Sequence, residues 1–126
     1  MNEQTRGGGG PQITVVGVGH GGAATVGRLA RDWPDGPRTV ILGTDREMLA
    51  QSPVPASDRL LIGESQARGL STGGNVDLGR AAAESGREAI QGILAGEAMV
   101  FLVGGLGGGL ATGALPVLAR QARAFG

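Results

Sequence analysis

The stretch QITVVGVGHGGAATVGRLARD, residues 12–32, decides the fold. Its first part, Gln12–Val18, is a short run rich in β-branched residues, which favours a strand. The part that follows has apolar residues at helical spacing, including Val26 and Ala30. Between them the glycines of 17–22 have the spacing G-x-G-x-x-G, which allows the backbone to turn sharply. The pattern predicts a strand, a glycine turn and a helix.

The same order repeats along the chain. Further strands are expected at 39–42, 60–62 and 99–103, and further helices at 46–51, from Asn75 or Asp77 to Gly96, and from the glycines of 104–109 to the end. The run MVFLV at 99–103 is apolar throughout, as in a strand that is covered on both faces. Alternating strands and helices predict an α/β fold, a Rossmann-like parallel sheet with helices on both faces.

The long helix before the last strand has a clear pattern of its own. Arg80 and Glu84 are spaced as an i,i+4 pair on its solvent side. Its expected apolar face consists of Leu78, Ala82, Ser85, Ala89 and Ile93.

Composition excludes several classes of function. Eleven Lys and Arg balance eleven Asp and Glu, so a nucleic-acid partner is not expected. The absence of cysteine and the single His20 exclude disulfides and structural zinc. No apolar run approaches the roughly 18 residues of a membrane span, and no signal peptide is evident. We therefore expect a cytoplasmic protein with a disordered glycine-rich tail at 1–11 and one domain at 12–126.

Glycine clusters mark the expected site. The chain has 26 glycines, which gather at 7–10, 17–22, 69–79 and 104–113. The last three of these clusters follow predicted strands, and ligands of parallel sheets collect at the carboxyl ends of strands. A glycine-rich loop that opens a helix offers free N–H groups to an anion. The sequence therefore predicts an anion cradle, although tight helix packing could also require one or two of these glycines.

Four of these segments together resemble the tubulin/FtsZ family of GTPases. Residues 105–117 (GLGGGLATGALPV) resemble its signature loop, G-M-G-G-G-T-G-T-G-A-A-P-V in the bacterial form. Residues 17–28 are similar to its G-V-G-G-G-G-G-N-A-V-N-R, 44–45 to its N-T-D, and 69–75 to its G-L-G-A-G-A-N. The resemblance runs from Ile13 onward in the family's order.

The resemblance implies that the glycine loops hold the phosphates of GTP or GDP, with or without Mg²⁺. It implies no catalytic or metal-ligating residue within this sequence. The expected nucleotide-binding residues are Gly17, Gly19, His20, Gly21, Gly22, Thr44, Asp45, Thr72, Gly73, Gly74, Gly105, Gly107, Gly108, Gly109, Thr112 and Gly113.

Several residues depart from the family pattern. Leu110 and Ala111 replace a Thr and a Gly of the signature, and Ala24 replaces an Asn of the first loop. Gly43 and Val76 replace the Asn of N-T-D and a helix-opening Pro. These changes remove side-chain contacts to a nucleotide and leave the backbone cradle.

The resemblance also implies a partner and leaves enzymatic activity open. In the family the base-reading residues and the acidic catalytic loop come later in the chain than the segments matched here. Association is implied with a second copy, or with an FtsZ-like protein, head to tail. Two other interpretations remain: an NAD(P)-binding unit of an oxidoreductase, in which Asp45 would serve a ribose, and a non-catalytic relic or interaction module.

Overall fold

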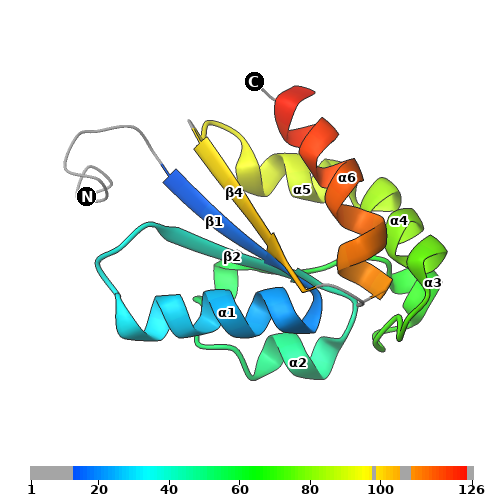
Figure 1. The fold of residues 1–126 in the computed structure, drawn as a ribbon, viewed down its shortest axis with the longest axis horizontal. Coiled ribbons are helices and arrows are strands. Elements are labelled where there is room, and N and C mark those ends of the chain that lie inside the picture. Colours follow the sequence, from blue (N-terminus) through cyan, green and yellow to red (C-terminus); the bar gives the residue numbers. More distant parts are fainter. Residues whose placement is uncertain (1–12, 98, 106–108, 125–126) are drawn as a thin grey trace.

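The computed structural model describes residues 13–97, 99–105 and 109–124 (Figure 1). The predicted disordered tail at 1–11 lies outside the described residues. In chain order the elements are β1 (Ile13–Val18), α1 (Gly19–Asp32), β2 (Arg38–Gly43), α2 (Arg46–Ala50), the 3₁₀ helix η2 (Ala56–Asp58), β3 (Arg59–Leu61), α3 (Glu64–Ala67), α4 (Val76–Ser85), α5 (Arg87–Leu94), β4 (Met99–Gly104) and α6 (Gly109–Ala124). Within these described ranges, no helix is long and apolar enough to cross a bilayer.

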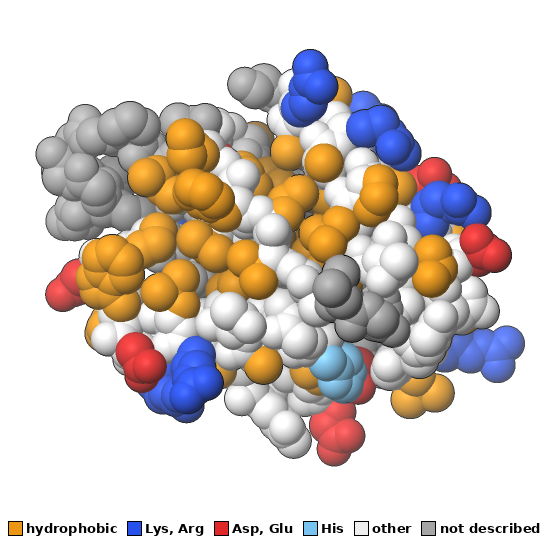
Figure 2. Space-filling model, in the orientation of Figure 1, with side chains coloured by type: hydrophobic (Ala, Val, Ile, Leu, Met, Phe, Trp, Pro, Cys, Tyr) orange, Lys and Arg blue, Asp and Glu red, His pale blue; other side chains and the backbone are white. Residues whose placement is uncertain are grey.

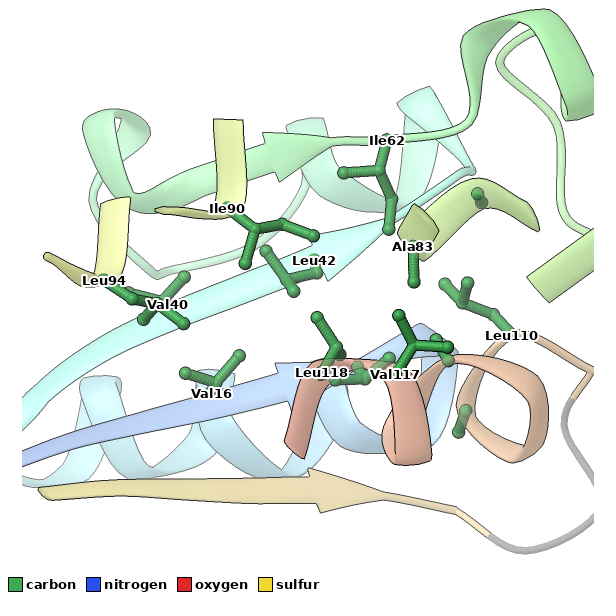
Figure 3. Packing of buried hydrophobic residues seen from close by; sticks show 14 residues of the cluster. Val16, Val40, Leu42, Ile62, Ala83, Ile90, Leu94, Leu110, Val117 and Leu118 are labelled. Atoms are coloured by element: carbon green, nitrogen blue, oxygen red, sulfur yellow. The ribbon is translucent and has the colours of Figure 1, made fainter. Parts of the chain in front are cut away.

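The four strands form one parallel sheet in the order β3-β2-β1-β4. Because side chains alternate along a strand, Val40 and Leu42 of β2 point to one face and Ile41 points to the other. The first face packs on α4, α5 and α6 (Figure 3), and the second packs on α1 and α2 (Figure 1). The predicted Rossmann-like α/β fold, with helices on both faces, is confirmed.

β4 differs from the prediction, because one of its faces is partly buried, through Val100 and Leu102, and the other is largely exposed near its start. Met99 and Phe101 are 52% and 51% exposed, and Ile13 on neighbouring β1 is 39% exposed. Figure 2 shows hydrophobic side chains gathered on this face of the molecule. In the described part of the chain β4 pairs with β1 alone, so it is an edge strand, and α1 covers only part of its second face.

The predicted long helix is divided in two at Gly86, which joins α4 to α5. A Cβ at Gly86 would lie 2.9 Å from Ile62 Cγ2, so the glycine lets this bend pack against the end of the sheet. After the bend, Ile90 and Leu94 are buried and Ala89 of the predicted apolar face is exposed. Ser85, just before the bend, is also exposed.

The predicted Arg80–Glu84 pair is also wrong. Arg80 Nη2 lies 2.9 Å from Asp77 Oδ1, one turn earlier in α4. Asp77 is in the first turn, where a carboxylate also interacts favourably with the helix dipole.

An ion-pair network ties the elements together at the end of the sheet where the strands begin. Arg38 at the start of β2 donates to Glu97 Oε2 at 2.8 Å, to Asp58 Oδ1 at 2.9 Å and to the carbonyl of Ile93 at 2.8 Å. Thr14 of β1 donates to the other oxygen of Glu97. Partial burial opposes the charge of Arg38, but hydrogen bonds and charges of Asp58 and Glu97 outweigh it and raise its pKa above the usual value. The cation is therefore permanent.

We expect Arg38→Met to lower the free energy of unfolding by about 2–3 kcal/mol, because two largely buried carboxylates lose their cation. Chemical denaturation measures this change. Arg87→Met is the control, because Arg87 is exposed at the start of α5 and has no ion-pair partner among the described residues. It should change stability by no more than about 0.5 kcal/mol. Equal losses in the two variants would contradict the role of the network.

Candidate functional site

A pocket of about 210 Å³ opens at the carboxyl ends of the strands. Three of the predicted glycine clusters meet there: the turn from β1 into α1, the loop at 69–74, and the start of α6. Small-molecule pockets commonly have roughly 300–1,000 Å³, so this volume suits part of a ligand, such as a phosphate group. Its described lining consists of Val18, Gly19, His20, Gly21, Thr44, Met48, Ser71, Thr72, Gly73, Gly105, Gly109, Leu110 and Ala111.

The first cluster forms the opening turn of α1. The helix begins at Gly19, which has a φ of +74°, a conformation that favours glycine. Gly17 and Gly22 have a different role, because a Cβ on Gly17 would overlap the carbonyl of Gly22, and a Cβ on Gly22 would overlap that of Val103. These two glycines let α1 approach the sheet, which brings its free N–H groups to the pocket.

The loop at 69–74 is fixed at both ends by backbone hydrogen bonds. The N–H of Arg46 donates to the carbonyl of Gly69 at 3.0 Å, and the N–H of Gly109 donates to that of Gly73 at 3.0 Å. Gly73 has a φ of +61°, and a Cβ added to it would meet no atom within 4 Å. This glycine therefore serves the backbone conformation and leaves the pocket open.

α6 reaches the pocket because it lies very close to α4. A Cβ on Gly113 would overlap the carbonyl of Val76, and a Cβ on Gly79 would overlap that of Gly109. Asn75 then begins α4, with its side chain accepting from the N–H of Leu78 at 3.0 Å. The contact places the N-termini of both helices beside the loop at 69–74.

His20 and Asp45 form an ion pair at the edge of the pocket. Nε2 of His20 lies 3.0 Å from Oδ2 of Asp45. The other oxygen of Asp45 accepts from the N–H groups of Glu47 and Met48 at 3.1 and 3.2 Å, as the N-cap of α2.

Half of the predicted residues line the pocket, and six of the others lie outside its lining in the described structure. Those that line it are Gly19, His20, Gly21, Thr44, Thr72, Gly73, Gly105 and Gly109. Gly17, Gly22 and Gly113 permit close packing, and Asp45 contacts the pocket through His20. Gly74 and Thr112 are exposed and are not part of the lining. Gly107 and Gly108 lie outside the described residues.

Sequence reasoning missed five lining residues: Val18, Met48, Ser71, Leu110 and Ala111. Four of these, Val18, Ser71, Leu110 and Ala111, lie within the quoted family segments, so their position in those segments was a usable signal. Met48 lies one turn into α2 and carries no such signal.

The pocket is suited to anions by its backbone more than by its side chains. The N-termini of α1 and α6 contribute partial positive charge, and Thr44, Ser71 and Thr72 contribute hydroxyl donors. The described lining contains no Lys or Arg, and in the described residues no cluster of three His, Asp or Glu could hold a metal ion. Such a pocket can bind and orient an anionic group.

A parallel sheet with glycine turns and helix N-termini at its strand ends defines an α/β phosphate-binding type of domain. Residues 12–125 match the tubulin/FtsZ family, GTPase domain. The chain belongs to this family. Neither the fold nor the comparisons support the oxidoreductase interpretation, since Asp45 is engaged with His20 and the start of α2.

Individual relatives agree with this assignment. The chain is 39% identical over 115 residues to cell division protein FtsZ 1 of Methanocaldococcus jannaschii, covering 91% of this chain and 31% of the relative. It is 38% identical over 114 residues to cell division protein FtsZ of Neisseria meningitidis, covering 90% of this chain and 29% of the relative. The chain thus spans about a third of the length of these curated relatives.

Solved structures show the same fold. An empty FtsZ dimer of M. jannaschii matches with a TM-score of 0.87 at 38% identity, covering 95% of this chain and 34% of that one. A GDP-bound monomer of CetZ1 from Haloferax volcanii matches with a TM-score of 0.80 at 27% identity, covering 90% of this chain and 38% of that one.

We expect Gly113→Ala to lower the free energy of unfolding by about 1–3 kcal/mol, because the added methyl group must separate α6 from α4. Gly92→Ala in α5 is the matched control, since a Cβ there would meet no atom within 4 Å. It should raise stability by up to about 1 kcal/mol through helix propensity. Thermal or chemical unfolding of both variants checks the sign of each change. If Gly113→Ala does not lower the free energy of unfolding, α4 and α6 are not in close contact.

Proposed function

We propose that the pocket binds the phosphates of a guanine nucleotide, GDP or GTP. The observation that supports this most directly is the meeting of two helix N-termini and three hydroxyl groups at one opening, in a chain of this family. The solved CetZ1 structure contains GDP and has the same fold. The residues fit a phosphate, because among the described residues a Cβ at Gly73 would meet no atom within 4 Å and one at Gly105 would meet the Cα of Gly21 alone.

We include Mg²⁺ in this proposal, as a cation that binds together with the phosphates. Since the described residues provide no cluster of acidic and histidine side chains, the cation would be held mainly by phosphate oxygens and water. The backbone N–H groups of the pocket would hold and orient the phosphates.

Gly21→Leu tests the proposal, because Gly21 lines the pocket and a Cβ there clears its nearest neighbour, Gly105 Cα, by 3.4 Å. The rest of the leucine side chain then occupies the pocket or its entrance. We expect at least about tenfold weaker binding of GDP by calorimetry, roughly 1.4 kcal/mol. Gly74→Leu is the control, since Gly74 is exposed and does not line the pocket, and a Cβ there would meet no atom of the described residues within 4 Å. Unchanged GDP binding in Gly21→Leu would place the nucleotide elsewhere. No binding by the unsubstituted chain would favour the relic or interaction module.

We further propose that the chain is a cytoplasmic, cytoskeletal protein that associates head to tail through the face bearing this pocket. The FtsZ structure of M. jannaschii described as a dimer supports such association, as do the relatives named as cell division proteins.

Added to FtsZ polymers, the 126-residue chain should then act as a filament cap, because it carries the pocket face and matches only about a third of the length of its FtsZ relatives. Mixed with a full-length FtsZ at equimolar ratio, it should reduce light scattering by polymers and show no GTP turnover above that of the FtsZ alone. Unaffected polymers, or robust turnover by the chain on its own, would refute this role.

A further inference from the structure

His20 is the one side chain in the described lining of the pocket that can carry a positive charge. It is the single histidine of the sequence, and its side chain is 59% exposed (pale blue in Figure 2). A glycine occupies this position in the family motif G-V-G-G-G-G-G-N that residues 17–24 resemble. The family motif therefore has no counterpart of this imidazole side chain.

Asp45 holds the imidazole at the edge of the pocket. Its Oδ2 lies 3.0 Å from Nε2 of His20, while its Oδ1 is kept in place by the N–H groups that begin α2. The carboxylate is only 21% exposed, so it is the more rigid member of the pair. The ring consequently lies between the pocket and a neighbouring groove lined by Arg28 and Arg31.

The hydrogen bonds of the pair depend on the charge of the imidazole. A carboxylate accepts only, so Nε2 must carry the proton that bonds Asp45, and in a neutral ring Nδ1 is then an acceptor. A fully ionised phosphate also offers only acceptors. The imidazolium form alone can therefore donate to Asp45 and to a phosphate at the same time. It also places a positive charge between two negative groups.

We propose that His20 is the phosphate-contacting cation of this pocket and that Asp45 is its positioning residue. This inference rests on the proposed binding of nucleotide phosphates. It adds that His20 is protonated when the phosphates are bound. Binding is therefore coupled to protonation of the imidazole. Affinity rises as the pH falls.

Other charged groups near the ring do not supply this role. Arg28 and Arg31 belong to the same helix and line the neighbouring groove, with Arg31 Nε 3.4 Å from Asp32. At the start of α2, Arg46 is paired with Glu64, and Glu47 is exposed and acidic. The loop at 69–74 and residues 109–119 of α6 contain no charged side chain. Asp45 is thus the one charged group in contact with His20 among the described residues.

Calorimetry of GDP binding at pH 6 and pH 8 tests the inference, with His20→Gln as the variant. The unsubstituted chain should bind about tenfold more tightly than His20→Gln at pH 6, and the two should converge at pH 8. Because the terminal phosphate of GDP itself titrates near pH 6, the comparison between the two proteins isolates the imidazole. In buffers of different ionisation heat, His20→Gln should lose most of the proton uptake.

Arg31→Gln serves as the control for general electrostatics, since it removes a nearby cation that does not line the pocket. It should change the affinity at pH 6 less than about twofold. Asp45→Asn keeps a good cap for α2 but loses the negative charge, so it should reduce the difference between pH 6 and pH 8. If GDP binds and the unsubstituted chain and His20→Gln have equal affinities at pH 6, the role of His20 is overturned. The proposed nucleotide binding would then still stand.

A second readout separates this failure from failure of the proposed function. The NMR signals of a single histidine are unambiguous, and pyrophosphate can serve as the probe. At pH 6.5 we expect the imidazole signals to shift on addition of pyrophosphate, and the shift to shrink in Asp45→Asn. Absence of both GDP binding and any imidazole response would overturn the two proposals together.

Discussion

The contact between α4 and α6 is the constraint on which the pocket depends. Three positions without side chains, Gly79, Gly109 and Gly113, let the two helices come so close that a Cβ on any of them would collide with backbone atoms. This proximity allows Gly109 to donate its N–H to Gly73 and so fixes the loop at 69–74 against the start of α6. Packing of the helices, rather than side-chain bonds, therefore determines where the backbone donors of the pocket lie.

This arrangement gives the glycine clusters two distinct purposes. Gly17, Gly22 and Gly113 are needed because backbone lies where their side chains would be. Gly19, Gly73 and Gly105 line the pocket, and their lack of side chains leaves room for an anion. At the other end of the sheet, Arg38 of β2 forms partly buried ion pairs with Asp58 of η2 and with Glu97 before β4. Thr14 of β1 joins this network by donating to Glu97. Ion pairs thus stabilise the end of the sheet where its strands begin, and close backbone packing stabilises the end where they finish.

Local patterns predicted most of the fold, since each strand and the start of most helices follow from short runs of residues. The β-branched run before Gly17 and the cap residue Asn75 are examples in which sequence neighbours decide the structure. The bend at Gly86 depends on how tightly Ile62 packs there, and the exposure of Met99 and Phe101 depends on β4 lying at the sheet edge. Both are set by tertiary contacts. Likewise, the sequence alone did not separate the glycines of the cradle from those needed for packing. The close approach of Gly113 to Val76 arises only from how α4 and α6 pack together.

The measurement that tests the central claim most directly is the response of backbone amides to GDP, followed by NMR on the 126-residue chain. If the pocket holds the phosphates, the largest shifts fall on the amides at 19–22, 71–73 and 109–111, where the first turns of α1 and α6 and the loop between them meet. Shifts confined to the groove around Arg28 and Pro53, or spread without a centre, would contradict the account and leave the glycine clusters with packing as their only role.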